Sequence, residues 1–507
     1  MVAGLVPVNL AVQALSFASS IALAVILGAS ASTDAYYLGL SIPVLVSGIL
    51  LAGVRLGAIP LLTERRVEGV ERFVEGCREL ISAVLCASIV LSAAATGITI
   101  LALPLIIGRA SETVVPLAQV TVLELAPLGV SGAIIGALGA ILAVRGRFVP
   151  TVAVMGFEPL IKTVLVITLG RSLGVHALVI GNVVGSLLAA LCLWRLVVAD
   201  GVSLRLTRPT NSGFVKRVLT FSGPLLIGQS ILQANPIVDR TMASTLGPGS
   251  VTVLELGLRM FGVPLALLGS TLIGPVTATW AARKTEGGWP ALRSSVTGAL
   301  TKISIVAPPL VVLGVFLADE SATLMYVGGA YSLREIDATG SVLKMLILGL
   351  PAQLFMLAFA VLFVVQGDTR FLMCLGVANV ALNVGLNLVL RSVFGLSGIA
   401  LSTTLTLTLL TALAATVAHR RWGVVGSRSM GQRIPRLAVA SLLATVTAYA
   451  IGALLGDSPT RAGALLSIVA VTGGVVAAYS VSMLVGDRRH LQGVIPARRH
   501  AGGADRG

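Results

Sequence analysis

The chain has 507 residues, of which 56% are hydrophobic and only 11% are charged, and its formal net charge is +15. Soluble domains have about 25% charged residues. This shortfall, with a mean hydropathy of +0.98, excludes an ordinary water-soluble protein and predicts a surface that mostly faces lipid.

Runs of about 20 apolar residues, enough to cross a bilayer as a helix, recur along the whole chain. The loops between them are short and leave no room for a soluble domain. We therefore predict an all-α integral membrane protein with about fourteen transmembrane helices. The predicted spans are 6–28, 36–62, 79–108, 115–144, 148–170, 174–199, 218–243, 250–281, 299–318, 337–366, 371–390, 395–418, 437–455 and 462–486.

Lysine and arginine predict the orientation, because cytoplasmic loops of membrane proteins carry an excess of both. With the N-terminus inside, the inner loops and tail hold 25 of these residues and the outer loops hold 5. This bias predicts cytoplasmic termini and an even number of spans. It also explains the high net charge by topology and by contact with anionic membrane lipids, so nucleic acid is not an expected partner.

The two halves of residues 1–420 resemble each other at an offset near 220. Leu27-Gly28 and Thr33 recur as Leu246-Gly247 and Thr252, and Gly174-Val175 recurs as Gly395-Leu396. Six spans separate equivalent points, so the pattern predicts two parallel six-helix repeats followed by two extra C-terminal helices. The predicted parts are an N-lobe (1–199), a cytoplasmic linker (200–217), a C-lobe (218–419), a cytoplasmic loop (420–436), the last two spans (437–486) and a basic cytoplasmic tail (487–507).

Ionised side chains inside a membrane are costly and usually face a cavity or a partner. Glu158 and Lys162 lie mid-span and one helical turn apart, either as a self-neutralised pair or as part of a water-accessible lining. Their repeat equivalents, Asn379 and Asn383, are also polar, which favours the lining.

Glu255 and Arg259 form a second pair of this spacing, predicted either as a structural salt bridge or as a cavity arginine positioned by its glutamate. An arginine at this depth suits a phosphate, because its planar fork binds two oxygens. Asp239 and Arg240 lie near an outer helix end, where we expect Arg240 to pair with Asp239 or to reach the interface. Arg55 fits an interfacial or a cavity position.

Motifs for catalysis or for a bound cofactor are missing. The chain has no G-x-x-x-x-G-K-[ST] loop and no H-E-x-x-H, and its four cysteines form no C-x-x-C pair. We therefore expect a transporter rather than an enzyme, with no cofactor and no metal site, driven by a Na⁺ or H⁺ gradient or by the membrane potential.

The segment from Gly28 to Pro43, with its Thr33-Asp34-Ala35-Tyr36-Tyr37 core, resembles the MurJ/MviN-type lipid II flippases of the multidrug/oligosaccharidyl-lipid/polysaccharide exporter superfamily. Residues 256–269, 366–370 and 395–401 resemble later helices of that family. The resemblance runs over nearly the whole chain and implies fourteen spans, a cationic central cavity and alternating access. It implies functional roles for Asp34 and Arg259, whereas Gln13, Ser19 and Ser47 stand where the family has arginines, with Arg55 as a substitute for the last.

These observations predict a flippase for a polyprenyl-diphosphate-linked saccharide, foremost the peptidoglycan precursor lipid II, in a bacterial inner membrane. The predicted substrate-binding residues are Arg259, Asp34, Arg55 and Glu255; the candidates for the cavity or for ion coupling are Glu158, Lys162, Asp239, Arg240, Asn379 and Asn383. Cell-wall synthesis proteins are expected partners. The alternatives are a flippase for another polyprenyl-linked glycan (capsule, exopolysaccharide or teichoic-type), an ion-coupled multidrug exporter, and an inactive wall-synthesis scaffold.

Overall fold

The computed structural model describes residues 5–107, 113–203, 213, 216–218, 220, 234–424, 434–456 and 460–494. These ranges are almost entirely helical, as expected in lipid, where a helix satisfies its own backbone hydrogen bonds. Among them, ten helices are long and apolar enough to cross a membrane, or eleven if the bent pair α13 (Leu333–Ile347) and α14 (Leu350–Gln366) is one span. The predicted multi-pass all-α fold is confirmed; the count of fourteen is not.

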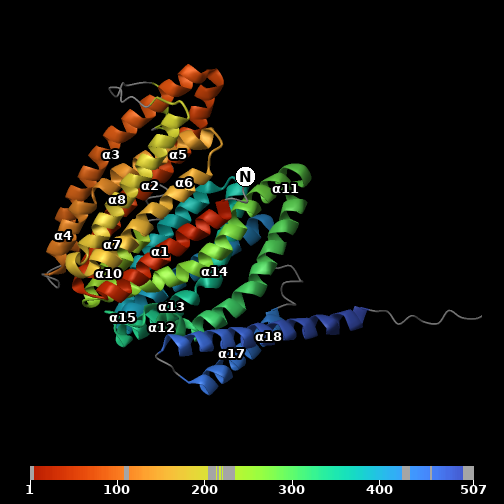
Figure 1. The fold of residues 1–507 in the computed structure, drawn as a ribbon. Helices are drawn as coiled ribbons and strands as arrows, with labels where there is room; N and C mark the ends of the chain where they lie inside the picture. Colours follow the sequence, from red (N-terminus) through yellow and green to blue (C-terminus); the bar gives the residue numbers. More distant parts are fainter. Residues whose placement is uncertain are drawn as a thin grey trace, which may run out of the picture.

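The N-lobe is built from helices of the first 199 residues (Figure 1). In its hydrophobic core, α2, α3, α5 and α8 pack around Leu62, Leu80, Leu138 and Leu193. The elements are α1 (Leu5–Leu27), α2 (Ala31–Glu68), α3 (Val70–Ile107), α4 (Val114–Leu125), α5 (Pro127–Val144), α6 (Val149–Ala153), η3 (Val154–Gly156), α7 (Phe157–Leu173) and α8 (His176–Ala199).

The C-lobe has its own core, in which α11, α14 and α15 pack around Leu300 and Phe363. A further core, around Tyr36 and Leu254, joins residues of both lobes. The C-lobe elements are α10 (Ala234–Ala243), η4 (Ser244–Leu246), α11 (Ser250–Phe316), α12 (Ala318–Tyr326), α13, α14 and α15 (Thr369–Trp422).

Two C-lobe helices are each too long for a single span. The 54 residues of α15 would extend about 80 Å, against about 30 Å of hydrocarbon. A non-helical glycine interrupts each of them, Gly288 in α11 and Gly395 in α15. Each therefore contains two of the predicted spans.

The internal repeat is visible in the backbone. Gly174 has φ 57° and ψ −133°, and its repeat equivalent Gly395 has φ 56° and ψ −131°. Gly146 and Gly367, separated by the same offset, also share a positive φ, 78° and 82°. Equivalent points in the two halves of the sequence therefore make the same turns.

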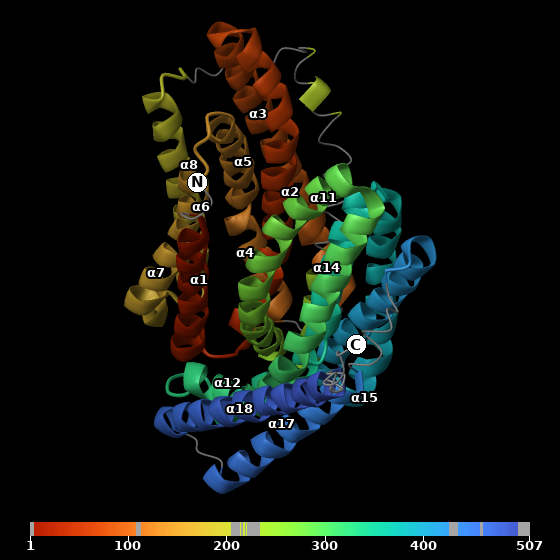
Figure 2. The same ribbon diagram turned by 90° about the vertical axis from the view of Figure 1, so that its right-hand side faces the viewer.

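The two lobes converge at the end where α1 meets α12 and diverge towards the far ends of α3, α5, α11 and α14 (Figure 2). The last two helices, α17 (Ile434–Leu455) and α18 (Arg461–Val494), lie against α11 and α12 of the C-lobe (Figure 2). Ala440, Ala444 and Ala448 let α17 approach closely, and the Tyr479 hydroxyl donates to the Ile305 carbonyl oxygen at 2.7 Å.

Several predicted parts fall wholly or partly outside the described residues. The predicted seventh span, 218–243, is described at 218, at 220 and from 234 onward, where α10 begins. Most of the predicted linker (200–217), much of the loop (420–436) and the final thirteen residues of the tail (487–507) lie outside the described residues.

The turn at Gly395 generates a stability prediction. Its φ, ψ pair lies in a region that side chains with a Cβ rarely adopt, at a cost of about 1–3 kcal/mol, although open space surrounds the position. We expect Gly395→Ala to lower the thermal midpoint of the detergent-solubilised protein, followed by tryptophan fluorescence.

The matched control is Gly385→Ala in the same helix, where the added methyl also meets open space but the backbone is helical. Alanine is the better helix former there, so the midpoint should stay or rise. Equal effects of the two substitutions would contradict the proposed backbone strain.

Candidate functional site

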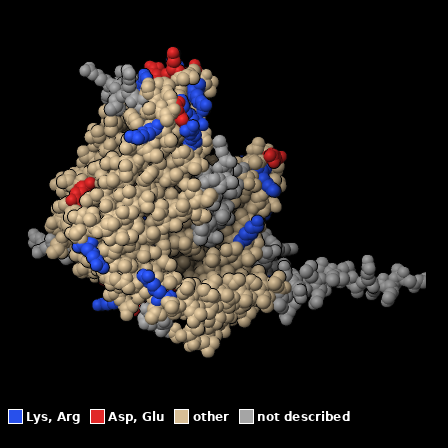
Figure 3. Space-filling view, viewed as in Figure 1, with Lys and Arg blue, Asp and Glu red and all other residues tan. Residues whose placement is uncertain are grey.

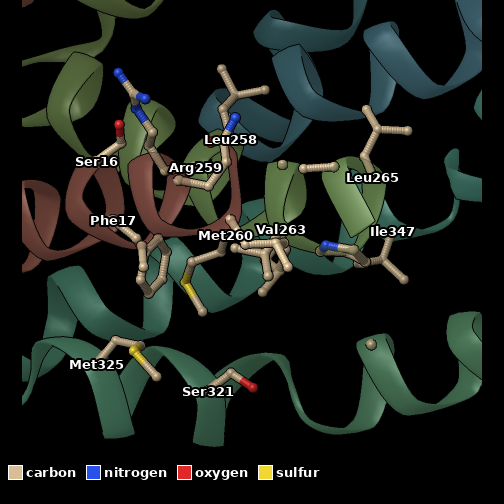
Figure 4. Close-up of a pocket in the computed structure, with 18 of the residues that line it drawn as sticks. Ser16, Phe17, Leu258, Arg259, Met260, Val263, Leu265, Ser321, Met325 and Ile347 are labelled. Atoms are coloured by element: carbon tan, nitrogen blue, oxygen red, sulfur yellow. The ribbon is translucent and has the colours of Figure 1, made fainter. Parts of the chain in front are cut away.

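A cavity of about 1090 Å³ lies between the lobes, walled by α1 on one side and by the first part of α11 on the other (Figure 4). Most of its lining is apolar. Arg259 is the single charged residue among the described residues that line it; its uncharged polar neighbours include Asn9, Gln13 and Ser16 from α1. The cavity thus combines one cation with amide and hydroxyl groups in an apolar wall.

The Arg259 side chain is exposed and, among the described residues, has no ion-pair partner. The predicted pair with Glu255 is wrong. Glu255 lies one turn earlier on α11, is 4% exposed, and instead pairs with Arg240 of α10. The buried Glu255 carboxylate is thus neutralised by a cation from the neighbouring helix α10 and not by one from its own helix.

Arg240 also joins the lobes. Besides Glu255, it donates to the Ser41 hydroxyl of α2 at 3.0 Å. The expected pair with Asp239 is therefore replaced by a pair with Glu255, and the Arg240 side chain is only 14% exposed. The Glu255–Arg240 pair is neutral overall, so it leaves Arg259 as the free positive charge of the cavity.

Asp34 forms the main polar joint between the lobes. It is 1% exposed, and its carboxylate accepts from the backbone N–H groups of Gly249 at 2.7 Å and Thr252 at 2.8 Å. The Thr252 hydroxyl donates to the same carboxylate at 2.7 Å, and its oxygen lies 2.9 Å from the Thr33 hydroxyl. An N-lobe carboxylate thus caps the N-terminus of C-lobe helix α11, where N–H groups lack intrahelical partners.

Small residues let the backbones of the lobes touch beside Asp34. The Ala330 N–H donates to the Val25 carbonyl oxygen at 2.8 Å. A Cβ on Gly28 would lie 2.6 Å from the Ala330 carbonyl oxygen, and one on Gly329 would lie 2.2 Å from that of Val25. This end of the lobe interface is therefore closed by backbone contact.

The predicted pair of Glu158 and Lys162 forms in the N-lobe. Lys162 Nζ lies 3.6 Å from the Glu158 carboxylate and donates to the Asn182 side-chain oxygen at 3.2 Å. Asn182 in turn donates to the Tyr36 hydroxyl at 2.6 Å. Neither charged residue is among the described residues that line the central cavity, so the pair is part of the lobe's own polar network.

The equivalent place in the C-lobe holds a buried cluster around Asp239. The Asn387 side chain donates to Asp239 at 2.7 Å and to the Asn383 side-chain oxygen at 2.9 Å. Thr403 lies 3.4 Å from Asp239 and from Asn383. Asn379, one turn before Asn383, is only half-buried. The described residues contain no group of three or more His, Cys, Asp or Glu that could hold a metal.

Arg55 does not join the cavity. It is half-buried on α2, and its side chain approaches Gly139 of α5 within the N-lobe. The substrate-binding role expected for it has no support in this placement.

Sequence reasoning missed the contact partners at the lobe joint. Thr33 and Thr252 are recognisable in the sequence as repeat equivalents, and residues next to a two-fold axis contact their own equivalents. Their hydrogen bond could therefore have been inferred from the repeat. Ser41 and Thr403 give no such signal.

Comparison with known proteins identifies relatives along most of the chain. The family model described as lipid II flippase MurJ matches residues 23–459. A probable lipid II flippase MurJ of Rhizobium meliloti (strain 1021) is 26% identical over 310 residues, covering 60% of this chain and 57% of the relative. The chain spans about half the length of the first curated relatives it matches, 45% and 57%.

Solved structures share the fold. A lipid II flippase MurJ in an inward closed conformation superposes with a TM-score of 0.78 at 16% identity, covering 96% of this chain and all of the other. An inward-facing multidrug-resistance transporter of the MATE family superposes with a TM-score of 0.68 at 18% identity, covering 82% of this chain and 98% of the other. At these identities the likeness extends to the fold alone.

The Asp34 joint generates a prediction about the lobes. Asp34→Asn removes the charge that caps α11, at a cost of about 2 kcal/mol, which would shift the closed-to-open ratio at this end about 30-fold. Spin labels at the repeat-equivalent exposed positions Ser172 and Ser392, in a cysteine-free background, should show a new population at longer distance.

The control is Asp337→Asn, an exposed aspartate in the first turns of α13, which should leave the distance distribution unchanged. A distribution in Asp34→Asn identical to that of the unsubstituted protein would show that the carboxylate does not hold the lobes together.

Proposed function

The chain belongs to the MurJ family of lipid II flippases, and on that premise we propose that this multi-pass protein translocates lipid II, the undecaprenyl-diphosphate peptidoglycan precursor, across the bacterial inner membrane. The observation that carries the proposal is Arg259, which lines a large cavity between the lobes and has no ion-pair partner in the part of the chain that the structure describes. A guanidinium binds phosphate oxygens in a bidentate manner, and in an apolar wall its attraction for an anion is strong.

The uncharged polar groups of the cavity suit the rest of the substrate. Gln13 stands where the family has an arginine, and together with Asn9 and Ser16 it lines the same cavity as Arg259. Amide and hydroxyl groups both donate and accept hydrogen bonds, as sugar hydroxyls require. One cation with several such groups fits a diphosphate attached to a saccharide.

The closed joint at Asp34 supports alternating access. The charge bias predicts that the loops around Gly28, Gly249 and Ala330 lie on the outer side of the membrane. The lobes therefore meet at the outer side and diverge towards the cytoplasm (Figure 2), in an inward-facing state with both termini inside. Translocation then requires the Asp34 joint to open while the inner ends of the lobes close.

The cavity lining discriminates among the alternatives. A multidrug exporter for cationic substrates needs acidic groups, and the described lining residues contain none. An inactive scaffold gives no reason for an unpaired arginine inside the membrane. A flippase for another polyprenyl-linked glycan would use the same diphosphate contact, and its substrate would differ in the sugar.

We assign the coupling of transport to a Na⁺ or H⁺ gradient to the C-lobe cluster around Asp239. Asp239 is buried and surrounded by side-chain oxygens and amides of Asn383, Asn387 and Thr403. A carboxylate with such neighbours offers hard oxygen ligands to Na⁺ or a site for H⁺. Since α10 carries Asp239 and also Arg240, which contacts Glu255 and Ser41, occupancy of this cluster can act on the lobe interface.

Arg259 gives the first test of function. Arg259→Ala is expected to reduce lipid II flipping at least tenfold, because the diphosphate loses a charge-assisted bidentate contact of about 1.5–3 kcal/mol. The measurement is lipid II accessibility at the outer surface of cells depleted of their own flippase, with membrane insertion checked by immunoblot.

The control is Arg334→Ala, an exposed arginine at the start of α13, which should retain full activity. Wild-type flipping in Arg259→Ala would remove the central site. If the unsubstituted chain failed to expose lipid II but exposed another lipid-linked glycan, the substrate assignment would pass to that glycan.

Asp239 gives the test of coupling. In proteoliposomes, flipping by the unsubstituted chain should rise with an imposed Na⁺ or H⁺ gradient. Asp239→Asn should abolish that dependence and leave the rate of flipping seen without a gradient, because the neutral amide cannot exchange a proton or balance the charge of a cation. The same gradient response in both proteins would place coupling elsewhere.

A further inference from the structure

A second, basic cavity lies at the end of the N-lobe opposite the Asp34 joint. Its volume is about 370 Å³, and it forms where the C-terminal ends of α2, α5 and α8 meet the start of α3. Figure 3 shows charged side chains gathered at this end of the molecule, above a flank that carries few. We call this cavity the N-lobe arginine pocket. It is lined by Arg66, Val70, Phe73, Arg145, Arg147 and Asp200.

Three arginines face one carboxylate in this pocket. Arg147 pairs with Asp200 at 2.9 Å, and Arg145 lies over the Phe73 ring at 5.5 Å from its centre. Arg66 donates to the Val144 carbonyl oxygen, and Arg145 to that of Asp200. Each guanidinium carries five donor N–H bonds, so these contacts leave donors for a ligand.

The internal repeat shows which of these contacts serve the scaffold. In the C-lobe, Lys284 donates to the Val365 carbonyl oxygen, the repeat equivalent of Val144. Asp368 pairs with Arg421, at the positions equivalent to Arg147 and Asp200 but with the charges exchanged.

In the C-lobe, one cation bonded to the end of a helix and one ion pair are therefore enough to connect these helix ends. The repeat equivalent of Arg145 is the uncharged Gln366. Arg145 lies 3.9 Å from the Asp200 carboxylate, which Arg147 already contacts, so two cations share one acid and the pocket keeps an excess of positive charge.

The surroundings of the pocket are those of a membrane surface. Val67, in the last turn of α2, and Val70, the first residue of α3, are 85% and 74% exposed. Exposed valines beside guanidinium groups suit the boundary between acyl chains and headgroups, where basic residues attract anionic lipids. Glu68 and Glu71 occupy the same turn but are not among the residues that line the pocket.

We propose that the N-lobe arginine pocket binds the phosphate of an anionic phospholipid from the cytoplasmic leaflet, with its acyl chains against Val67 and Val70. A lipid headgroup and free phosphate could both bind here through phosphate oxygens held by the arginine guanidinium groups. The valines favour a lipid over a free phosphate. This site is separate from the central cavity and does not depend on which substrate that cavity carries.

The test measures binding of short-chain phosphatidylglycerol to the full-length protein by native mass spectrometry, with phosphatidylcholine for comparison. Arg147→Gln should weaken phosphatidylglycerol binding about fivefold. Asp200→Asn should strengthen it, because it removes the pocket's acid and frees Arg147. If Arg147 and Asp200 had only a structural role, both substitutions would weaken phosphatidylglycerol binding.

Arg421→Gln is the matched control, since it breaks the equivalent ion pair of the C-lobe, and it should leave phosphatidylglycerol binding unchanged. The proposal is overturned if Arg147→Gln and Arg421→Gln act alike, or if phosphatidylcholine binds as tightly as phosphatidylglycerol. It is also overturned if inorganic phosphate displaces phosphatidylglycerol at equal concentration, which would indicate a site for small anions.

Discussion

The arrangement of the two lobes depends on one buried carboxylate. Asp34 lies in the first turn of α2, and its carboxylate accepts hydrogen bonds from backbone N–H groups at the N-terminus of α11 in the other lobe. Helix termini have unpaired donors and a partial positive charge, so a buried anion is stabilised there without a basic partner. Because the acceptor and the donors belong to different lobes, opening this end leaves both unsatisfied. The joint therefore favours the closed arrangement that the structure shows.

The distribution of buried charge then determines what the central cavity can bind. An isolated ion in the interior costs several kcal/mol, and Glu255 and Arg240 avoid this cost by pairing with each other. The pairing removes the glutamate that the sequence places nearest to Arg259. Among the described residues Arg259 is therefore left without an ion-pair partner in the cavity, and the proposed preference for an anion depends on a contact in which Arg259 takes no part.

The two repeats share a backbone but differ in chemistry. Gly174 and Gly395 make the same turn, while the charged pair Glu158–Lys162 on α7 corresponds to Asn379 and Asn383 on α15. The N-lobe neutralises its polar layer internally, and the C-lobe leaves Asp239 among neutral partners. The two lobes thus have similar walls, but one carries an acid–base pair and the other an acid among neutral partners.

Much of the fold could be predicted from the sequence because bilayer thickness and lipid polarity act on local composition. The apolar runs, the charge bias and the offset near 220 predict the helices, the expected orientation and the duplicated lobes. Asp34 and Arg259 could be selected by their motif, and the pair of Glu158 and Lys162 by its spacing. Partner choice could not be predicted in the same way. The spacing of Glu255 and Arg259 allows a salt bridge on one helix face, but α10 brings Arg240 to Glu255 instead. Sequence spacing reports neighbours within a helix; only the packing of one helix on another decides which charges are neutralised and which remain free to bind.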